Sequence, residues 1–275
     1  MNRLFVVLSV LCLPTAALAG IQDGRTGPGA RIGSGETSVG AVVEMATIKP
    51  AKGQEGDDQS SMALLLDAQL PVGPMPLRVR VPFQVSGPED TEAGLGNVAV
   101  GVAKALELGI GVDTAFVVGL DLLLPSQSKD LGKLVNVSPY RIAEFFPKQT
   151  SVVAHTALSV DTPIVDARLD VDYTHGLHNG LDLPEGTEIG DIQLLRMGAT
   201  ASVAVIPLVQ VVVGADWMKS VADDAADAST FLRAGVRGGA AVVDYGLEAN
   251  FPLGGPIADA ETQGMGIVAS VSAGF

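Results

Sequence analysis

Residues 77–85 read LRVRVPFQV, and their alternation decides the class of fold. Leu77, Val79 and Val81 stand at every second position, with Arg78 and Arg80 between them. Successive side chains of a β-strand point to opposite faces of the sheet. This period of two therefore predicts a strand with one apolar and one polar face.

The same period returns at 97–108, 112–122, 168–174, 209–217 and 243–251. In each stretch one face is apolar and the other is small or charged. A soluble β-sandwich would bury the apolar face in its core, whereas a membrane β-barrel would turn that face to the lipid and line its interior with the charged face. Alternation alone leaves both architectures open.

The connections between these stretches favour the barrel. Long polar segments alternate with short turns, as in outer-membrane barrels, which have long external loops and tight periplasmic turns. The long segments are 49–60, 87–94, 125–149, 178–189, 220–227 and 252–263. A barrel with both chain ends in the periplasm needs an even number of strands. We therefore interpret 138–146 as a short helix within a long external loop, because Ser138 suits an N-cap and Pro139 the first helical position.

About twelve strands remain, an even number that allows the barrel to close. Their expected ranges are 37–48, 61–71, 76–86, 95–107, 111–124, 150–161, 166–177, 190–206, 208–219, 228–238, 240–251 and 264–275.

The composition is compatible with a membrane barrel and excludes other classes. A net charge of −14 makes the chain a poor partner for nucleic acid. Charged residues make up only 17% of the chain and the mean hydropathy is +0.37, which is too apolar for a disordered acidic protein. Beyond the first 19 residues, no stretch approaches the roughly 18 uncharged apolar residues of a membrane-spanning helix.

Residues 1–19 have the pattern of a secretory signal peptide. Arg3 precedes the apolar run 4–13, and Ala17 and Ala19 form a small-x-small cleavage signature before Gly20. The one cysteine, Cys12, lies inside this segment, so we expect an exported chain without thiol or disulfide. We expect 20–35 to be a flexible periplasmic leader or partial plug, and 36–275 to be an outer-membrane barrel.

Aromatic residues fall where a membrane interface would place them. Phe83, Tyr173, Trp217 and Phe251 stand on apolar faces near the expected external ends of their strands. The final alternating strand ends on Phe275, which resembles the recognition signal of the outer-membrane assembly machinery. Membrane lipids and the barrel assembly machinery are therefore expected partners.

A family resemblance rests on residues 77–126. LRVRVPFQVSG is followed by GLGN at 94–97, which opens VAVGVAKAL, and by FVVGLDLLLPS at 116–126. These segments resemble the outer-membrane family named for the meta-pathway of phenol degradation, which is related in architecture to transporters of fatty acids and aromatic hydrocarbons. Asn97 departs from the aspartate usual there, and Ser126-Gln127 from a Thr-Gly pair. The resemblance implies a barrel that moves small organic molecules, and it carries over no catalytic residue.

The histidines do not predict an active site. His155 shares a face with Ser151, Ser159 and Asp161, but strand residues four apart lie about 13 Å from each other, beyond the reach of a catalytic triad. His175 and His178 have weak metal-binding spacing. We expect no catalytic residue, no metal site and no cofactor.

The polar faces predict a charged barrel interior. Because buried charges must pair, these residues would form structural salt bridges, a charge-lined constriction that selects small solutes, or both. The expected interior charges are Arg78, Arg80, Asp113, Asp121, Arg168, Asp170, Asp172, Arg196, Asp216, Arg233, Arg237, Asp244 and Glu248.

The sequence thus predicts an all-β, closed antiparallel transmembrane barrel that gives small solutes, including hydrophobic or aromatic ones, a passive pathway. Two alternatives remain at this point. One is a non-conducting barrel with a structural or surface-binding role, and the less favoured one is a soluble secreted β-sandwich.

Overall fold

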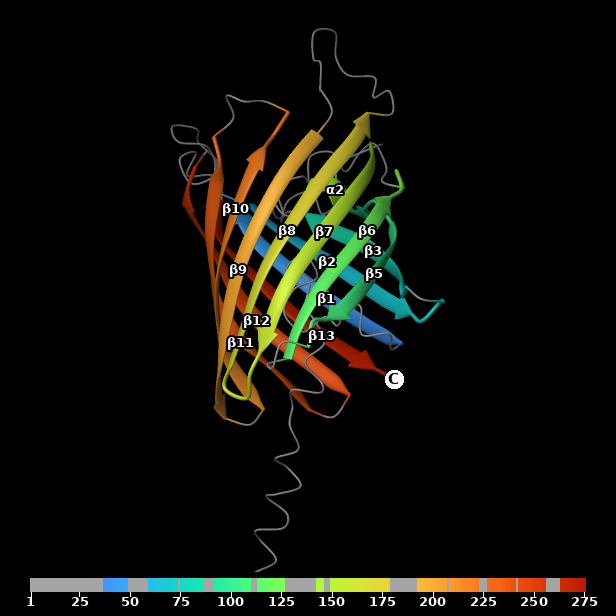
Figure 1. Ribbon diagram of the computed structural model, residues 1–275. Coiled ribbons are helices and arrows are strands. Elements are labelled where there is room, and N and C mark those ends of the chain that lie inside the picture. Colours follow the sequence, from blue (N-terminus) through green and yellow to red (C-terminus); the bar gives the residue numbers. More distant parts are fainter. Residues whose placement is uncertain are drawn as a thin grey trace, which may run out of the picture.

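Among the residues that the structure describes, the protein is all-β apart from one helical turn (Figure 1). The computed structural model describes residues 37–48, 59–73, 75–86, 92–109, 113–126, 142–145, 149–178, 192–206, 208–222, 227–240, 242–255 and 263–275. The expected leader at 1–19 and the segment at 20–35 lie outside the described residues.

The strands form one antiparallel sheet of thirteen strands. Their bounds are β1 Ser38–Ile48, β2 Gln59–Leu70, β3 Leu77–Ser86, β4 Glu92–Leu95, β5 Ala99–Glu107, β6 Asp113–Leu123, β7 Gln149–Asp161, β8 Val165–His178, β9 Ile192–Ile206, β10 Val209–Ser220, β11 Ser229–Ala240, β12 Val243–Gly254 and β13 Gln263–Gly274. The helical turn α2 spans Ile142–Phe145, between β6 and β7.

The sheet closes on itself. β1 pairs with β2 on one side and with β13 on the other, so Ser38 lies opposite both Gln69 and Gly274. β2 in turn pairs with β3, β3 pairs with both β4 and β5, and from β5 onward each strand pairs with the next one in the chain up to β13. Because β4 pairs only with β3, the remaining twelve strands form the ring. The predicted closed barrel of about twelve strands is confirmed.

The fourth position of the ring differs from the expectation. Instead of one strand over 95–107, the chain forms β4, which pairs with the C-terminal residues 83–86 of β3, and then β5, which pairs with the N-terminal residues 77–80 of β3. Between them, the backbone N–H of Gly96 donates to the carbonyl of Pro82, while that of Asn97 donates to the carbonyl of Glu144 in α2. The strand is interrupted because its backbone turns aside to bond α2. The segment 87–94, expected to be loop, thus contains part of a strand.

The helical turn also differs from the expectation. Helix forms within the expected 138–146 range, but only Ile142–Phe145 is helical among the described residues, and the side chains of Glu144 and Phe145 are buried. Their partners lie on strands of the barrel rather than in solvent. The connection between β6 and β7 thus holds the expected helical turn, but it folds inward at these two residues.

The apolar faces point outward. Val213 and Leu247 are 52% and 50% exposed, while their polar neighbours on the same strands, Asp216 and Glu248, are buried. Exposed apolar side chains recur on nearly every strand of the ring. A soluble sandwich would bury these side chains, so that alternative is wrong. No helix among the described residues is long and apolar enough to cross a membrane.

The two ends of the barrel are unlike. At one end, strands are joined by short connections such as 162–164 and 207–208. The strand ends that flank the longer connections lie at the other end, and α2 belongs to one of these connections, between β6 and β7. Phe83, Tyr173 and Phe251 lie partly exposed on the outer face, nearer the end with the longer connections. The expected outward phase of these aromatic residues matches the structure.

Candidate functional site: the barrel interior

The charged side chains meet inside the ring, as contacts between strands that are not neighbours show. Nη1 of Arg78 on β3 lies 3.3 Å from Nε2 of His155 on β7, although β5 and β6 separate the two strands. Nη2 of Arg237 on β11 lies 3.1 Å from Oδ2 of Asp166 on β8, across β9 and β10. Side chains of a closed ring can meet in this way only through its interior.

One wall carries a charge ladder, which we define as Asp172, Arg196, Asp216, Arg233 and Glu248. Its members come from five successive strands, β8 to β12, and all are buried. Nη1 and Nη2 of Arg196 donate to Asp172 at 2.6 Å and to Asp216 at 2.5 Å. Arg233 then pairs with Asp216 at 2.5 Å and with Glu248 at 3.4 Å. Each guanidinium therefore lies between two carboxylates, which offsets the cost of burying these charges.

Glycines make room for the ladder. Gly198 lies opposite Asp170 on one side and Asp216 on the other. A Cβ at Gly198 would overlap Oδ2 of Asp170 and would lie 2.7 Å from Oδ1 of Asp216. The charged side chains thus lie across the backbone of the neighbouring strand, in space that any larger residue would fill.

A second group lies at the end of the barrel with the short connections. Nε of Arg237 donates to Gln210 at 2.7 Å, and Nη2 donates to Ser202 at 2.6 Å. Nε2 of Gln210 in turn donates to Asp166 at 2.7 Å. This Asp166 network ties β8, β9, β10 and β11 together. The sequence predicted Arg237 as an interior charge but did not single out its three partners Asp166, Ser202 and Gln210.

The opposite wall carries a histidine group of Arg78, Asp121 and His155. A guanidinium can only donate hydrogen bonds. The contact of Arg78 with His155 therefore needs Nε2 of the ring to accept, so the proton of a neutral ring belongs on Nδ1, which lies 4.0 Å from Asp121. Among the described residues, the hydroxyls of Ser151 and Ser159 have no hydrogen-bond partner, so neither serine bonds His155.

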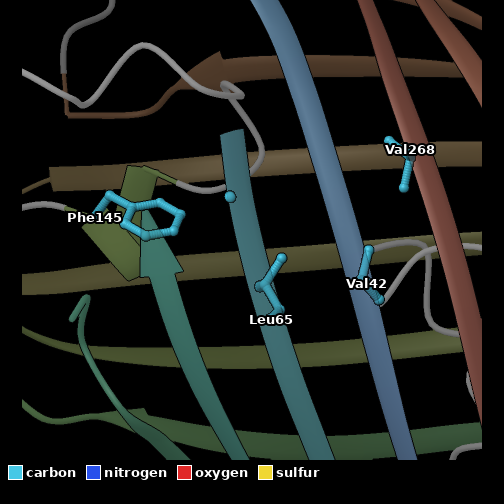
Figure 2. Packing of buried hydrophobic residues seen from close by; sticks show 5 residues of the cluster. Val42, Leu65, Phe145 and Val268 are labelled. Carbon is cyan, nitrogen blue, oxygen red and sulfur yellow. The ribbon is translucent and has the colours of Figure 1, made fainter. Parts of the chain in front are cut away.

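Arg80, on β3, connects the barrel wall to α2. Its Nε donates to Oδ1 of Asp67 at 2.7 Å, and its Nη1 donates to Oε1 of Glu144 at 3.2 Å. The side chain of Glu144 is only 1% exposed. Phe145, the next residue, packs against an apolar patch that consists of Val42, Ala63, Leu65 and Val268 (Figure 2).

The interior also has other apolar parts. On β5, β6 and β7, two small clusters of buried residues face inward, Ala99 with Leu123 and Val153, and Ala103 with Val117 and Ala157. Together with the apolar patch on β1, β2 and β13, they place apolar side chains among the polar and charged ones of these strands, such as Asp121 and His155. The interior thus offers both apolar and charged contacts.

Other expected interior residues take different positions. Asp113 is exposed at the start of β6, and Asp244 is half-buried at the start of β12, both at the end with short connections. Arg168 lies 3.7 Å from Asp170, which is also 3.7 Å from Arg196. Further inward side chains were not anticipated, namely Glu44, Asp67, Glu144, Phe145 and Phe231.

A sequence signal for Phe145 did exist. The run IAEFF at 142–146 is apolar except for Glu144, within a segment bounded by Pro139 and Pro147. Large apolar residues seldom stay in solvent-exposed loops without a partner.

Among the described residues, no group of three or more potential ligands could hold a metal ion.

Known outer-membrane barrels share this architecture, although their sequences differ. No protein-family model matches the chain, and no curated protein matches it in sequence. The COG4313 outer membrane channel from Pseudomonas putida F1 is similar with a TM-score of 0.62 at 13% identity, over 93% of this chain and 100% of that chain.

Two porins match at lower similarity. The KdgM porin in complex with disordered oligogalacturonate has a TM-score of 0.50 at 9% identity, over 86% of this chain and 99% of that chain. The NanC porin has the same TM-score and identity, over 86% of this chain and 98% of that chain. These identities establish the fold alone. The chain therefore has the fold of an outer-membrane β-barrel of the kind found in channels and porins.

Proposed function

We propose that this protein is an outer-membrane channel that gives small solutes a passive pathway. The observation that carries the proposal is the closed ring with its apolar side chains outside and its paired charges inside. Lipid solvates the outer face of such a ring, while its interior suits polar or charged solutes and water. The channel and porin neighbours support the same reading.

We also propose that the solutes have an apolar part. The inward clusters of β5, β6 and β7 and the apolar patch offer contacts that a uniformly charged pore would lack. This agrees with what the resemblance to the phenol meta-pathway family implies, namely small hydrophobic or aromatic molecules. That family membership remains a prediction.

Reconstitution tests the channel. We expect discrete current steps when the refolded protein is added to a planar lipid bilayer in KCl. We also expect vesicles that contain it to swell in solutions of small solutes and not in solutions of large oligosaccharides. Heat-denatured protein in the same detergent is the control. Folded protein that shows neither current nor swelling would indicate instead a non-conducting barrel with a structural or surface-binding role.

Location and assembly are part of the proposal. We propose export through residues 1–19 and insertion by the barrel assembly machinery, with Phe275 as part of the recognised strand. Phe275 is 75% exposed, and its backbone N–H donates to the carbonyl of Thr37 at 2.8 Å. Cell fractionation should find the protein in the outer membrane, starting at Gly20 by N-terminal sequencing. Recovery in the soluble periplasmic fraction would contradict this location.

A further inference from the structure

The helical turn α2 is held in the interior by contacts rather than by its own stability. An isolated helical turn is unstable in water, because nucleating a helix costs more than one turn returns. The position of α2 therefore depends on its contacts with the barrel, which include the following three. These are the ion pair of Glu144 with Arg80, the packing of Phe145, and the hydrogen bond from the Asn97 N–H to the Glu144 carbonyl at 2.6 Å.

The ring of Phe145 lies over the apolar patch. Figure 2 shows this ring on α2, beside the strand that carries Leu65, with Val42 and Val268 on the next two strands. Phe145 is 2% exposed, and Ala63 and Leu65 are completely buried. The patch is thus a buried apolar part of the interior that the ring of Phe145 contacts.

Arg80 adjoins this patch. Arg80 lies opposite Asp67 on β2, and Leu65 is two residues further along the same face of β2. Diagonal neighbours of this kind lie about 7–8 Å apart in an antiparallel sheet. One surface of the interior therefore presents a guanidinium next to an apolar area, and α2 covers both with a carboxylate and an aromatic ring.

We propose that Arg80 and the apolar patch form a binding site for a small aromatic carboxylate, and that Glu144 and Phe145 occupy this site as an internal ligand until such a solute displaces them. The inference rests on the proposed channel function, whose solute class it names. The solute's carboxylate takes the place of the Glu144 carboxylate on Arg80, and its ring takes the place of Phe145.

Charge and shape both favour this class of solute. Exchange of one carboxylate for another leaves Arg80 with the same two negative partners, whereas a neutral ligand would remove one of them from a buried cation. A guanidinium also binds carboxylates with strong charge-assisted hydrogen bonds. A carboxylate without a ring would leave the patch uncovered. The site should therefore reject both the neutral aromatic amide and the short aliphatic acid.

Calorimetric titration of the full chain in detergent with 3-phenylpropionate tests the site. We expect saturable binding, with 3-phenylpropionamide and propionate each at least tenfold weaker. Phe145→Ala should tighten binding by about tenfold, because it weakens the internal competitor and leaves the site more often vacant. Arg80→Gln should weaken binding by tenfold or more. Arg80→Lys, which keeps the charge but loses the planar guanidinium, should give an intermediate affinity.

Phe83→Ala is the matched control, since it removes a phenylalanine from the outer face of the strand that carries Arg80. It should leave the affinity unchanged. Each variant is first checked for heat-dependent gel mobility, so that only folded barrels are compared. If Phe145→Ala and Arg80→Gln both fold and bind 3-phenylpropionate as the parent does, the inference is wrong.

The outcome is separable from the channel test. Current in KCl without 3-phenylpropionate binding would leave the channel function standing and overturn the site. Binding without any current or swelling would support the site and remove the channel function. If α2 is instead a permanent part of the wall, Phe145→Ala will change neither affinity nor conductance, and the displacement is refuted.

Discussion

Gly235 lies opposite Glu248, where the backbones of β11 and β12 leave no room for a side chain. A Cβ at this position would overlap the carbonyl of Leu247 and would lie 2.7 Å from the Cα of Glu248. Because these atoms are backbone, Gly235→Ala should destabilise the barrel by about 1–3 kcal/mol. Urea unfolding followed by the fluorescence of Trp217 measures the loss. Gly254→Ala on β12, where nothing lies within 4 Å, should cost much less.

Arg196 holds the centre of the charge ladder. Arg196→Met would leave the buried carboxylates of Asp172 and Asp216 without the guanidinium they share. Breaking a buried pair in this way costs about 3–5 kcal/mol, so the unfolding midpoint should fall strongly. Asp113→Asn, which removes an exposed charge at the rim, should stay within about 0.5 kcal/mol of the parent. Equal effects of both changes would mean that the ladder contributes little to stability.

At the scale of the element, β12 offers a test of which part of the outer face meets lipid. Leu247 lies near the middle of the strand and Leu253 near its end, and both are exposed on the outer face. In lipid vesicles, Leu247→Arg should destabilise the barrel by about 2–4 kcal/mol, and Leu253→Arg by about 0–1 kcal/mol. If the two substitutions cost the same, β12 does not span a membrane in the proposed manner.

The strands were predictable from sequence because their signal is local. A period of two puts Arg78 and Asp172 on the polar faces of their strands without knowledge of any partner, and the pattern of long and short connections, which favours a barrel, turns those faces inward. The even-number argument removes 138–146 from the strand count. The break between β4 and β5 was not predictable, since it depends on a hydrogen bond from Asn97 to Glu144, 47 residues later in the sequence (144 − 97 = 47). The same holds for Phe145, whose partners lie on β1, β2 and β13.

The pairings inside the ring show a similar limit. Alternation places Arg196 and Asp216 on the same face, but it does not show which guanidinium meets which carboxylate. The strands that carry the charge ladder pair in chain order, so antiparallel pairing of β8 with β9 could anticipate the contact of Arg196 with Asp172. The contact of Arg78 with His155 could not, because it spans the interior between strands separated by two others.

For the whole molecule, the proposed orientation puts the longer connections outside the cell. The sequence contains one cysteine, Cys12, within the expected leader. A cysteine introduced elsewhere would therefore be the only thiol left after removal of the leader, and its labelling would report its own position. A membrane-impermeant maleimide should label Ala222→Cys on intact cells and should label Pro163→Cys only after lysis, although both positions are exposed. The parent chain should not be labelled. The reverse pattern would show the opposite orientation.

The seam of the ring has a consequence for biosynthesis. Ser38 lies opposite Gly274, so the strand nearest the start of the described chain completes its hydrogen bonds only with the strand that follows all the others. Until β13 pairs with β1, the partly formed sheet has an open edge at β1 and another at its last strand, and open edges tend to associate with other extended chains. Ring closure therefore requires β13, and a chaperone that shields those edges until then would keep the polypeptide from aggregating.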